Sequence, residues 1–411
     1  MATIPCPNLR QTDINSDLSL IEEKRKVNLE MNVKLLSLLL LVYSVNLGVI
    51  ITLNPLYSES LGADEMFVGF ITSAYAIAYT ISAPLWGKAS DVLGRKLALG
   101  FGMLGYSITV FLLAFARDPS QVLVIRMLGG FTDSSFWTVP TALIADLYTP
   151  QERGIALGKI GTVQLAGLIV GPSFGGILKA GFNDYSPIFY ICSALIFCTA
   201  ILVFFGVQEE PKASRKERKS CPEAPLELRE TAKKSFATAY FNMAFTSIAF
   251  GIIVSQFILH ANQILGQEYL VGLLLTSYYV AEAFIQPPAG KLSDIIGPRR
   301  ATQLAYVTCA LAFFILTLAS SPMFLLIAIV MAGLGIGTLY VGLTVSLMDM
   351  APSSQRGMVS GVQNIAWGFG YFVGPMVGGI VVTYSVSAPY IFCVIASVVG
   401  GIVTSLYMKK D

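Results

Sequence analysis

Residues 87–96 read GKASDVLGRK, and residues 290–299, 203 positions later, read GKLSDIIGPR. Each copy directly follows a long apolar stretch. The same offset of 203 relates Gly69 to Gly272 and Asp146 to Asp349. A long-period repeat that keeps glycine and charged residues in place predicts that the chain consists of two structurally similar halves.

Twelve stretches are long and apolar enough to cross a bilayer, since a membrane-spanning helix needs about 20 residues. The chain is 55% hydrophobic and only 13% charged, whereas soluble proteins carry about 25% charged residues. The net charge of +2 gives no reason to expect a nucleic-acid partner. We therefore expect an all-α membrane protein that is embedded in a lipid bilayer, with spans at 35–56, 66–86, 97–116, 122–143, 155–178, 187–207, 236–259, 269–289, 301–319, 323–347, 358–382 and 388–408.

The polar stretches between the spans divide the chain. We expect a tail at 1–34, a six-helix bundle at 35–207, a charged linker at 208–235, a second bundle at 236–408 and a short tail at 409–411. Of the 27 Lys and Arg residues, only Arg117, Arg126 and Lys179 lie outside the tails, the linker and the loops on the amino-terminal side of the membrane. The positive-inside rule then places both termini in the cytoplasm, and we expect the plasma membrane as the location.

Two motifs resemble those of a known family. Residues 87–96 resemble the loop motif Gly-x-x-x-Asp-(Arg/Lys)-x-Gly-Arg-(Arg/Lys) of the major facilitator superfamily, with Val92 at a usually basic position. Residues 167–176, GLIVGPSFGG, match the fifth-helix motif of its drug:proton antiporter branch, and residues 370–379, GYFVGPMVGG, repeat it. The resemblance implies twelve transmembrane helices in two pseudo-symmetric six-helix bundles, which transport by alternating access.

The two loop motifs predict a gate on the cytoplasmic side. A carboxylate at a helix end can bind the amino terminus of a neighbouring helix, and arginine can bridge to a carboxylate of the facing half. We interpret these residues as a latch that holds the outward-facing state. Its members are Gly87, Asp91, Gly94, Arg95, Lys96, Asp146 and Arg153 in the first half, and Gly290, Asp294, Gly297, Arg299, Asp349 and Arg356 in the second.

The two glycine-proline motifs predict a close pivot between the halves. Glycines four residues apart let membrane helices approach closely, and proline bends a helix. The predicted pivot consists of Gly167, Gly171, Pro172, Gly175, Gly176, Gly370, Gly374, Pro375, Gly378 and Gly379.

Few charged residues lie inside the predicted spans, and these are candidates for proton coupling. A charge at mid-bilayer costs about 2.5–3.5 kcal/mol on insertion scales, so it is expected to have a function. Arg126 and Asp133 share one face of the fourth span, and the sequence around Arg126 resembles the fourth-helix motif in which arginine is tied to proton coupling. Asp133 is the first choice for the proton carrier and Glu282 the second, although each could instead only bond a neighbouring helix.

Aromatic and amide side chains near these charges suggest a binding site for amphipathic or cationic small molecules, through apolar contact and cation–π attraction. The candidates are Phe136, Trp137, Gln164, Gln256, Tyr278, Tyr279, Glu282, Tyr340, Asn364 and Trp367. The single histidine and the six cysteines lack metal-ligand spacing, so we expect neither metal nor cofactor.

The sequence thus predicts a monomeric, proton-coupled exporter of small molecules such as drugs, and not an enzyme. Two alternatives stay open. One is a sugar, metabolite or lipid transporter that works by symport or uniport on the same scaffold, and the other is a non-transporting membrane sensor.

Overall fold

The computed structural model describes residues 11–148, 150–207, 230–351 and 356–408, and every regular element in these ranges is helical. Most of the predicted linker and the tail at 409–411 lie outside the described residues. Each of the twelve predicted spans lies along a helix, so the all-α prediction is confirmed.

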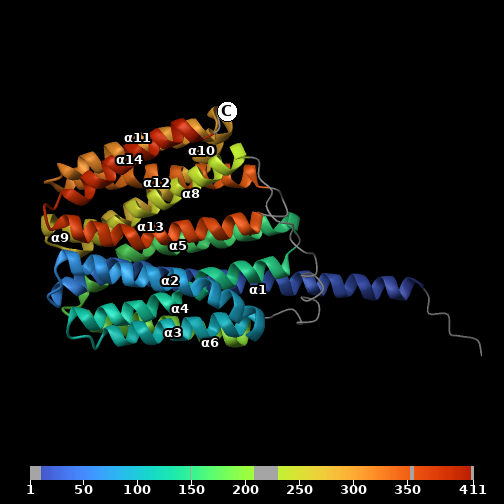
Figure 1. Ribbon diagram of the computed structural model, residues 1–411. Helices are drawn as coiled ribbons and strands as arrows, with labels where there is room; N and C mark the ends of the chain where they lie inside the picture. The colour runs from blue at the N-terminus through green and yellow to red at the C-terminus, as the bar shows by residue number, and fades with distance from the viewer. Residues whose placement is uncertain (1–10, 149, 208–229, 352–355, 409–411) are drawn as a thin grey trace, which may run out of the picture.

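Six helices form the first half of the chain and six helical segments form the second (Figure 1). The first six are α1 Gln11–Ser60, α2 Glu65–Leu93, α3 Arg95–Leu113, α4 Pro119–Leu147, α5 Pro150–Gly181 and α6 Ser186–Gly206. The second half begins with one long segment made of α8 Glu230–Ile252, the π-helix η1 Ile253–Phe257 and α9 Ile258–Leu265. It continues with α10 Glu268–Ile296, α11 Pro298–Thr317, α12 Pro322–Met350, α13 Arg356–Val382 and α14 Ala388–Tyr407.

Length and hydropathy identify eleven of these helices, within the described residues, as able to cross a membrane. The remaining long helix is α4, which carries Arg126 and Asp133 in its middle. These two charges lower its mean hydropathy, so the long helix that falls below the hydropathy of a typical span is the one that carries the two candidate coupling residues.

Local signals in the sequence start and stop the helices. Asp64 caps α2 by accepting a hydrogen bond from the Phe67 amide at 2.7 Å, and Asp118 caps α4 by accepting from the amides of Ser120 and Gln121. Gly94, with φ of 112°, and Gly297, with φ of 86°, make the tight turns that follow α2 and α10. Only glycine adopts such angles readily, so the repeated glycines of the loop motif fix where these helices end.

The two halves meet along two helix pairs, α2 with α13 and α5 with α10. We call this contact the seam. We call the end of the bundle where α6 ends and α8 begins the linker end, and the opposite end, where α2 and α10 begin, the far end. Helix α1 extends well beyond the bundle at the linker end in Figure 1, because it begins at Gln11 rather than near residue 35.

The seam is tight toward the far end. Ser73 donates a hydrogen bond to the Phe372 carbonyl, and Thr276, its counterpart in the repeat, donates to the Ile169 carbonyl, both at 2.8 Å. Gly69 packs on the Pro375 carbonyl, and the repeat-related Gly272 packs on that of Pro172. The hydrogen bonds and the close contacts therefore both follow the internal two-fold symmetry.

The same helix faces separate toward the linker end. Pro84 and Lys88 of α2 are exposed there, as are Gly361 of α13 and Gly158 of α5. A side chain added at either glycine would meet no atom within 4 Å. The structure is therefore closed between the halves at the far end and open at the linker end.

Candidate functional site

The Asp133 carboxylate is held by two tyrosines in the middle of the first half. Asp133 is fully buried, and its two oxygens accept hydrogen bonds from the hydroxyls of Tyr43 and Tyr75, each at 2.5 Å. Hydroxyl donors of this kind stabilise the ionised form of a carboxylate. Helices α1, α2 and α4 thus converge on one acidic group.

Arg126 lies two turns away on α4 and faces the same tyrosine. Its guanidinium carbon is 4.2 Å from the centre of the Tyr75 ring, a cation–π contact. Its Nε atom is buried and has no hydrogen-bond partner among the described residues. The Tyr75 ring in turn contacts the ring of Tyr371 in the second half, at a centroid distance of 6.3 Å. Tyr75 therefore links the carboxylate, the guanidinium and the opposite half.

A glycine makes this arrangement fit. Gly130 lies between Arg126 and Asp133, and a side chain there would run into the backbone of Tyr75, whose carbonyl carbon would be 2.9 Å from the added atom. The missing side chain lets α2 lie directly on α4, so the Tyr75 hydroxyl can reach the carboxylate. The pattern of Arg126, Gly130 and Asp133 on one helix face therefore serves packing as well as charge.

The second half has a different centre, made of Glu282 and aromatic rings. Glu282 is half-buried and interacts electrostatically with Tyr278, Tyr279 and Tyr340. The Tyr279 hydroxyl is buried and has no hydrogen-bond partner among the described residues, whereas the buried Tyr278 hydroxyl interacts with the Glu282 carboxylate. Trp367 contacts Tyr340 with a centroid distance of 5.4 Å. A carboxylate among several rings is a chemistry that suits organic cations.

The remaining predicted substrate residues lie in different surroundings. Phe136 is fully buried and stacks on the Tyr43 ring at 4.0 Å, and Trp137 is half-buried against Phe136. Gln164 is buried, and Asn364 is exposed on α13 toward the linker end. Gln256 lies in the π-helix at the far end, where its amide donates to the backbone carbonyl of Glu65 at 3.0 Å.

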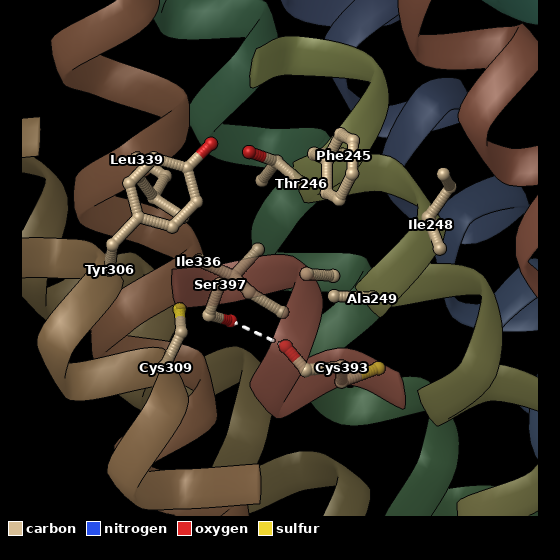
Figure 2. Close-up of a pocket in the computed structure, with 11 residues that line it drawn as sticks. Phe245, Thr246, Ile248, Ala249, Tyr306, Cys309, Ile336, Leu339, Cys393 and Ser397 are labelled. Atoms are coloured by element: carbon tan, nitrogen blue, oxygen red, sulfur yellow. Dashed lines mark hydrogen bonds between the residues drawn. The ribbon is translucent and has the colours of Figure 1, made fainter. Parts of the chain in front are cut away.

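The second half has no counterpart of the Asp133 centre. The repeat places Thr246, Cys309 and Ile336 where the first half has Tyr43, Tyr106 and Asp133. Thr246 and Cys309 are much smaller than tyrosine, and together with Ile336 they line a cavity of about 10 Å³ between α8, α11, α12 and α14 (Figure 2), which is room for about one water molecule. The charged centre and the small cavity therefore occupy equivalent places in the two halves.

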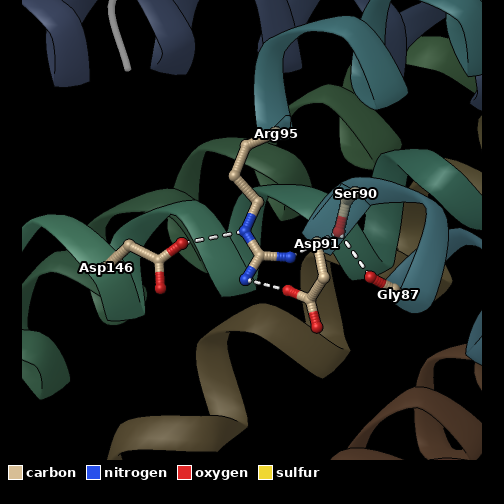
Figure 3. A network of polar contacts seen from close by, with 5 residues as sticks. All are labelled: Gly87, Ser90, Asp91, Arg95 and Asp146. Carbon is tan, nitrogen blue, oxygen red and sulfur yellow. Dashed lines mark hydrogen bonds and ion pairs between the residues drawn. The ribbon is translucent and has the colours of Figure 1, made fainter. Parts of the chain in front are cut away.

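The loop motif of the first half forms an ion-pair network at the linker end (Figure 3). The Arg95 guanidinium binds Asp146 of α4 through Nε and Asp91 of α2 through Nη2, each at 2.8 Å, and its Nη1 donates to the Ser90 hydroxyl. Arg95 is buried. These bonds join α2, α3 and α4 within one half, so a bridge from the motif to the facing half stays a prediction.

The second copy of the motif is built differently. The Arg299 guanidinium donates to the Ser405 carbonyl of α14. Asp294 and Asp349 are both exposed. Pro298 stands where the first copy has Arg95, which explains why the same network is not repeated. The side chains of Arg153 and Arg356 lie outside the described residues.

The glycine-proline motifs bring helices together within and between the halves. Gly171 packs on the Gly48 backbone of α1, and Gly374 packs on the Ile248 backbone of α8. Gly176 and its counterpart Gly379 pack across the seam instead, on the starts of α10 and α2. Gly167 and Gly175 lie against α1, and Gly370 and Gly378 lie against α8 and the π-helix. Most of the predicted pivot glycines thus form close helix contacts within one half, and a pivot between the halves stays a prediction.

Comparison with known proteins then identifies the family. A family model described as Major Facilitator Superfamily matches residues 36–267 and 235–411, which together cover most of the chain. This chain belongs to the Major Facilitator Superfamily. It is therefore a multi-pass membrane transporter of small molecules and not an enzyme, and its two six-helix halves are those of the major facilitator fold.

Relatives of this superfamily member include multidrug resistance proteins. Multidrug resistance protein 2 of Bacillus subtilis (strain 168) is 26% identical over 373 residues, which are 89% of this chain and 92% of that protein. Multidrug resistance protein MdtG of Salmonella paratyphi C (strain RKS4594) is 27% identical over 363 residues, 84% of this chain and 87% of that protein. The predicted resemblance to the drug:proton antiporter branch is thus supported by full-length relatives.

Solved structures agree on the fold of the superfamily. The crystal structure of a bacterial homologue of the human lysosomal transporter Spinster, in an inward-facing and unoccupied conformation, has a TM-score of 0.74 at 16% identity and covers 93% of this chain and 98% of that one. The nucleoside transporter NupG has a TM-score of 0.73 at 18% identity, with 93% and 100% covered. At these identities the likeness concerns the fold alone.

Sequence reasoning missed several residues of the described site. Tyr43 and Tyr75 bind Asp133, yet they were not among the candidates. The signal available was their place within spans, since a tyrosine hydroxyl buried in a bilayer needs a partner. Glu65 and Glu268 also face the opposite half, and their signal was that they repeat at the offset of 203.

Proposed function

We propose that this transporter exports amphipathic or cationic small molecules in exchange for protons, by alternating access. The observation that carries the proposal is the buried Asp133 carboxylate with its two tyrosine donors and Arg126 nearby. A lone acid in an apolar interior is a group that can take up and release a proton as its surroundings change. The multidrug resistance relatives support the same substrate class.

The two halves have separate tasks in this proposal. Asp133 carries the proton in the first half, and Arg126 provides a positive charge that competes with the proton for the carboxylate. Glu282 and the rings of Tyr340 and Trp367 bind the substrate in the second half. Tyr75 and Tyr371 touch across the seam, so a change at Asp133 reaches the substrate side through packed rings.

The orientation follows from the positive-inside rule. We propose that the linker end faces the cytoplasm, that both termini lie there and that the protein works as a monomer in the plasma membrane. The far end then faces outside, and the structure, open at the linker end, represents the inward-facing state. In the outward-facing state the two loop motifs would close against the facing half, as the latch interpretation predicts.

The test uses Asp133→Asn in inside-out membrane vesicles energised by a proton gradient. We expect the variant to lose gradient-driven accumulation of a cationic dye while it still binds the dye, because Asn has nearly the same shape as Asp but does not ionise and so carries no proton across the membrane. Asp118→Asn is the matched control, since Asp118 caps the same helix outside the bilayer and Asn also caps well. Unchanged gradient-driven transport in Asp133→Asn, with the wild-type pH dependence, would remove Asp133 from coupling.

A further inference from the structure

Two repeat-related glutamates tie the halves together at the far end. Glu65 begins α2 and Glu268, 203 positions later, begins α10. The amide of Gln263 in the second half donates to the Glu65 carboxylate at 2.8 Å. In the first half, the Tyr185 hydroxyl donates to the Glu268 carboxylate at 2.8 Å, and the Lys179 ammonium lies 3.7 Å from the same oxygen. Each carboxylate thus binds the opposite half.

The partners of these glutamates do not follow the repeat. The positions equivalent to Lys179 and Tyr185 hold Val382 and Ala388, and the position equivalent to Gln263 holds Ser60. By contrast, the contact of Gly69 with Pro375 has a full counterpart in the repeat, the contact of Gly272 with Pro172. Both halves therefore keep a carboxylate at the far end, whereas each half supplies the other with a different donor.

The position of these bonds decides what they do. They lie at the starts of α2 and α10, nearer the far end than the repeat-related contacts of Ser73 and Thr276. A path between the halves to the far side cannot open while they hold.

We propose that Glu65 and Glu268 form the far-end gate of the transporter, whose bonds to Gln263, Tyr185 and Lys179 set the balance between the two access states. The proposal rests on the proposed alternating access. Removing the gate bonds should leave the helices and the substrate centre intact. It should raise the population of the state that is open at the far end.

The experiment measures access to the seam. A cysteine introduced by Ser73→Cys is buried between the halves in the closed state, since Ser73 is 2% exposed. A membrane-impermeant maleimide is applied from the far side of oriented vesicles, and the parent protein without Ser73→Cys gives the background from native cysteines. With Glu65→Gln and Glu268→Gln combined, we expect the labelling rate to rise about tenfold. The neutral amide oxygen of glutamine accepts the bonds from Gln263 and Tyr185 more weakly than a carboxylate does and loses the attraction to Lys179, so the open population, which the rate follows, increases.

Asp64→Asn is the matched control for this measurement. Asp64 directly precedes Glu65 and is also an acid at the far end, but it caps its own helix and binds within its own half. Asp64→Asn, made in the protein that carries Ser73→Cys, should label at the same rate as Ser73→Cys alone. Equal labelling of the glutamine variant and this control would overturn the gate.

Reversal of the ion pair separates gating from a general loss of stability. Glu268→Lys and Lys179→Glu should each raise labelling when made alone, and together they should restore slow labelling, because the reversed pair attracts again. Fast labelling that persists in the reversed pair would contradict the proposal. The labelling rate is measured without substrate and without a proton gradient. A negative result for the gate therefore says nothing about proton coupling by Asp133, and a negative result for coupling says nothing about the gate.

Discussion

The hydroxyls of Tyr43 and Tyr75 should set the pH at which transport operates. Each donates to the Asp133 carboxylate at 2.5 Å, and the site is fully buried, so water does not replace a lost hydroxyl. A hydrogen bond to a charged group contributes about 1.5–3 kcal/mol, and 1.36 kcal/mol corresponds to one pH unit. Tyr43→Phe or Tyr75→Phe should therefore shift the pH dependence of coupled transport by about 1–2 units.

The sign follows from which form of the acid is stabilised. The hydroxyls bind the ionised carboxylate, so their loss favours the protonated form, and release of the proton then requires a higher pH. The midpoint of transport activity should move upward. Tyr75→Phe keeps the ring that contacts Arg126, so it tests the hydroxyl alone.

The assay is counter-transport in proteoliposomes at a fixed gradient, with the absolute pH varied on both sides. Tyr57→Phe is the matched control on α1, because the Tyr57 hydroxyl donates to the carbonyls of Leu113 and Ala116, far from Asp133. It should leave the midpoint in place. If Tyr43→Phe and Tyr75→Phe behave like Tyr57→Phe, the hydroxyls do not tune the coupling group and the reasoning fails.

Three further variants test other parts of the site. Glu282→Gln should raise the Kd of a cationic substrate about tenfold, as expected for the loss of a partly buried charge interaction, while the Kd of a neutral substrate stays within about twofold by equilibrium binding. Gly130→Ala should lower the stability by about 1–3 kcal/mol through the clash with Tyr75, seen as a lower melting temperature in detergent, whereas Gly129→Ala, whose nearest neighbour would be at 3.4 Å, should not. Arg95→Lys keeps the charge but loses the forked geometry, and it should also lower the melting temperature; an unchanged value would argue against a structural role for the network.

The fold could be predicted from the sequence because two strong signals coincide. The bilayer fixes the length of each apolar stretch, and the repeat of 87–96 at 290–299 fixes the relation of the halves. Two features were not predicted. Helix α1 begins at Gln11 inside a polar segment, where hydropathy carries no signal. The π-helix Ile253–Phe257 lies within an apolar run, and its wider turn depends on the helices packed around it rather than on a local sequence signal.

The site was predictable where charge is scarce and not where the residues are neutral. Asp133 and Arg126 stood out because charges within spans are rare, and the structure brings both to Tyr75. Tyr43 did not stand out, since an aromatic residue in a span is ordinary and its partner is 90 positions away in sequence. Periodicity places residues on a helix face, but the neighbouring helix on that face is a matter of tertiary packing.

Some contacts occur in both halves and others in only one. We expect the symmetric contacts of the seam to allow the two halves to move, and the groups found in only one half to set the direction of transport. The seam bonds of Ser73 and Thr276 are equivalent, so they contribute equally on both sides of the two-fold axis. They do not determine which half binds the proton and which half binds the substrate. A difference between the halves must come from groups without a counterpart. The position equivalent to Asp133 in the second half holds Ile336, and the position equivalent to Glu282 in the first half holds Tyr79. In the proposed mechanism, a proton that neutralises Asp133 changes the energy of one half only, and we expect the symmetric seam to convert that local change into a movement of both halves.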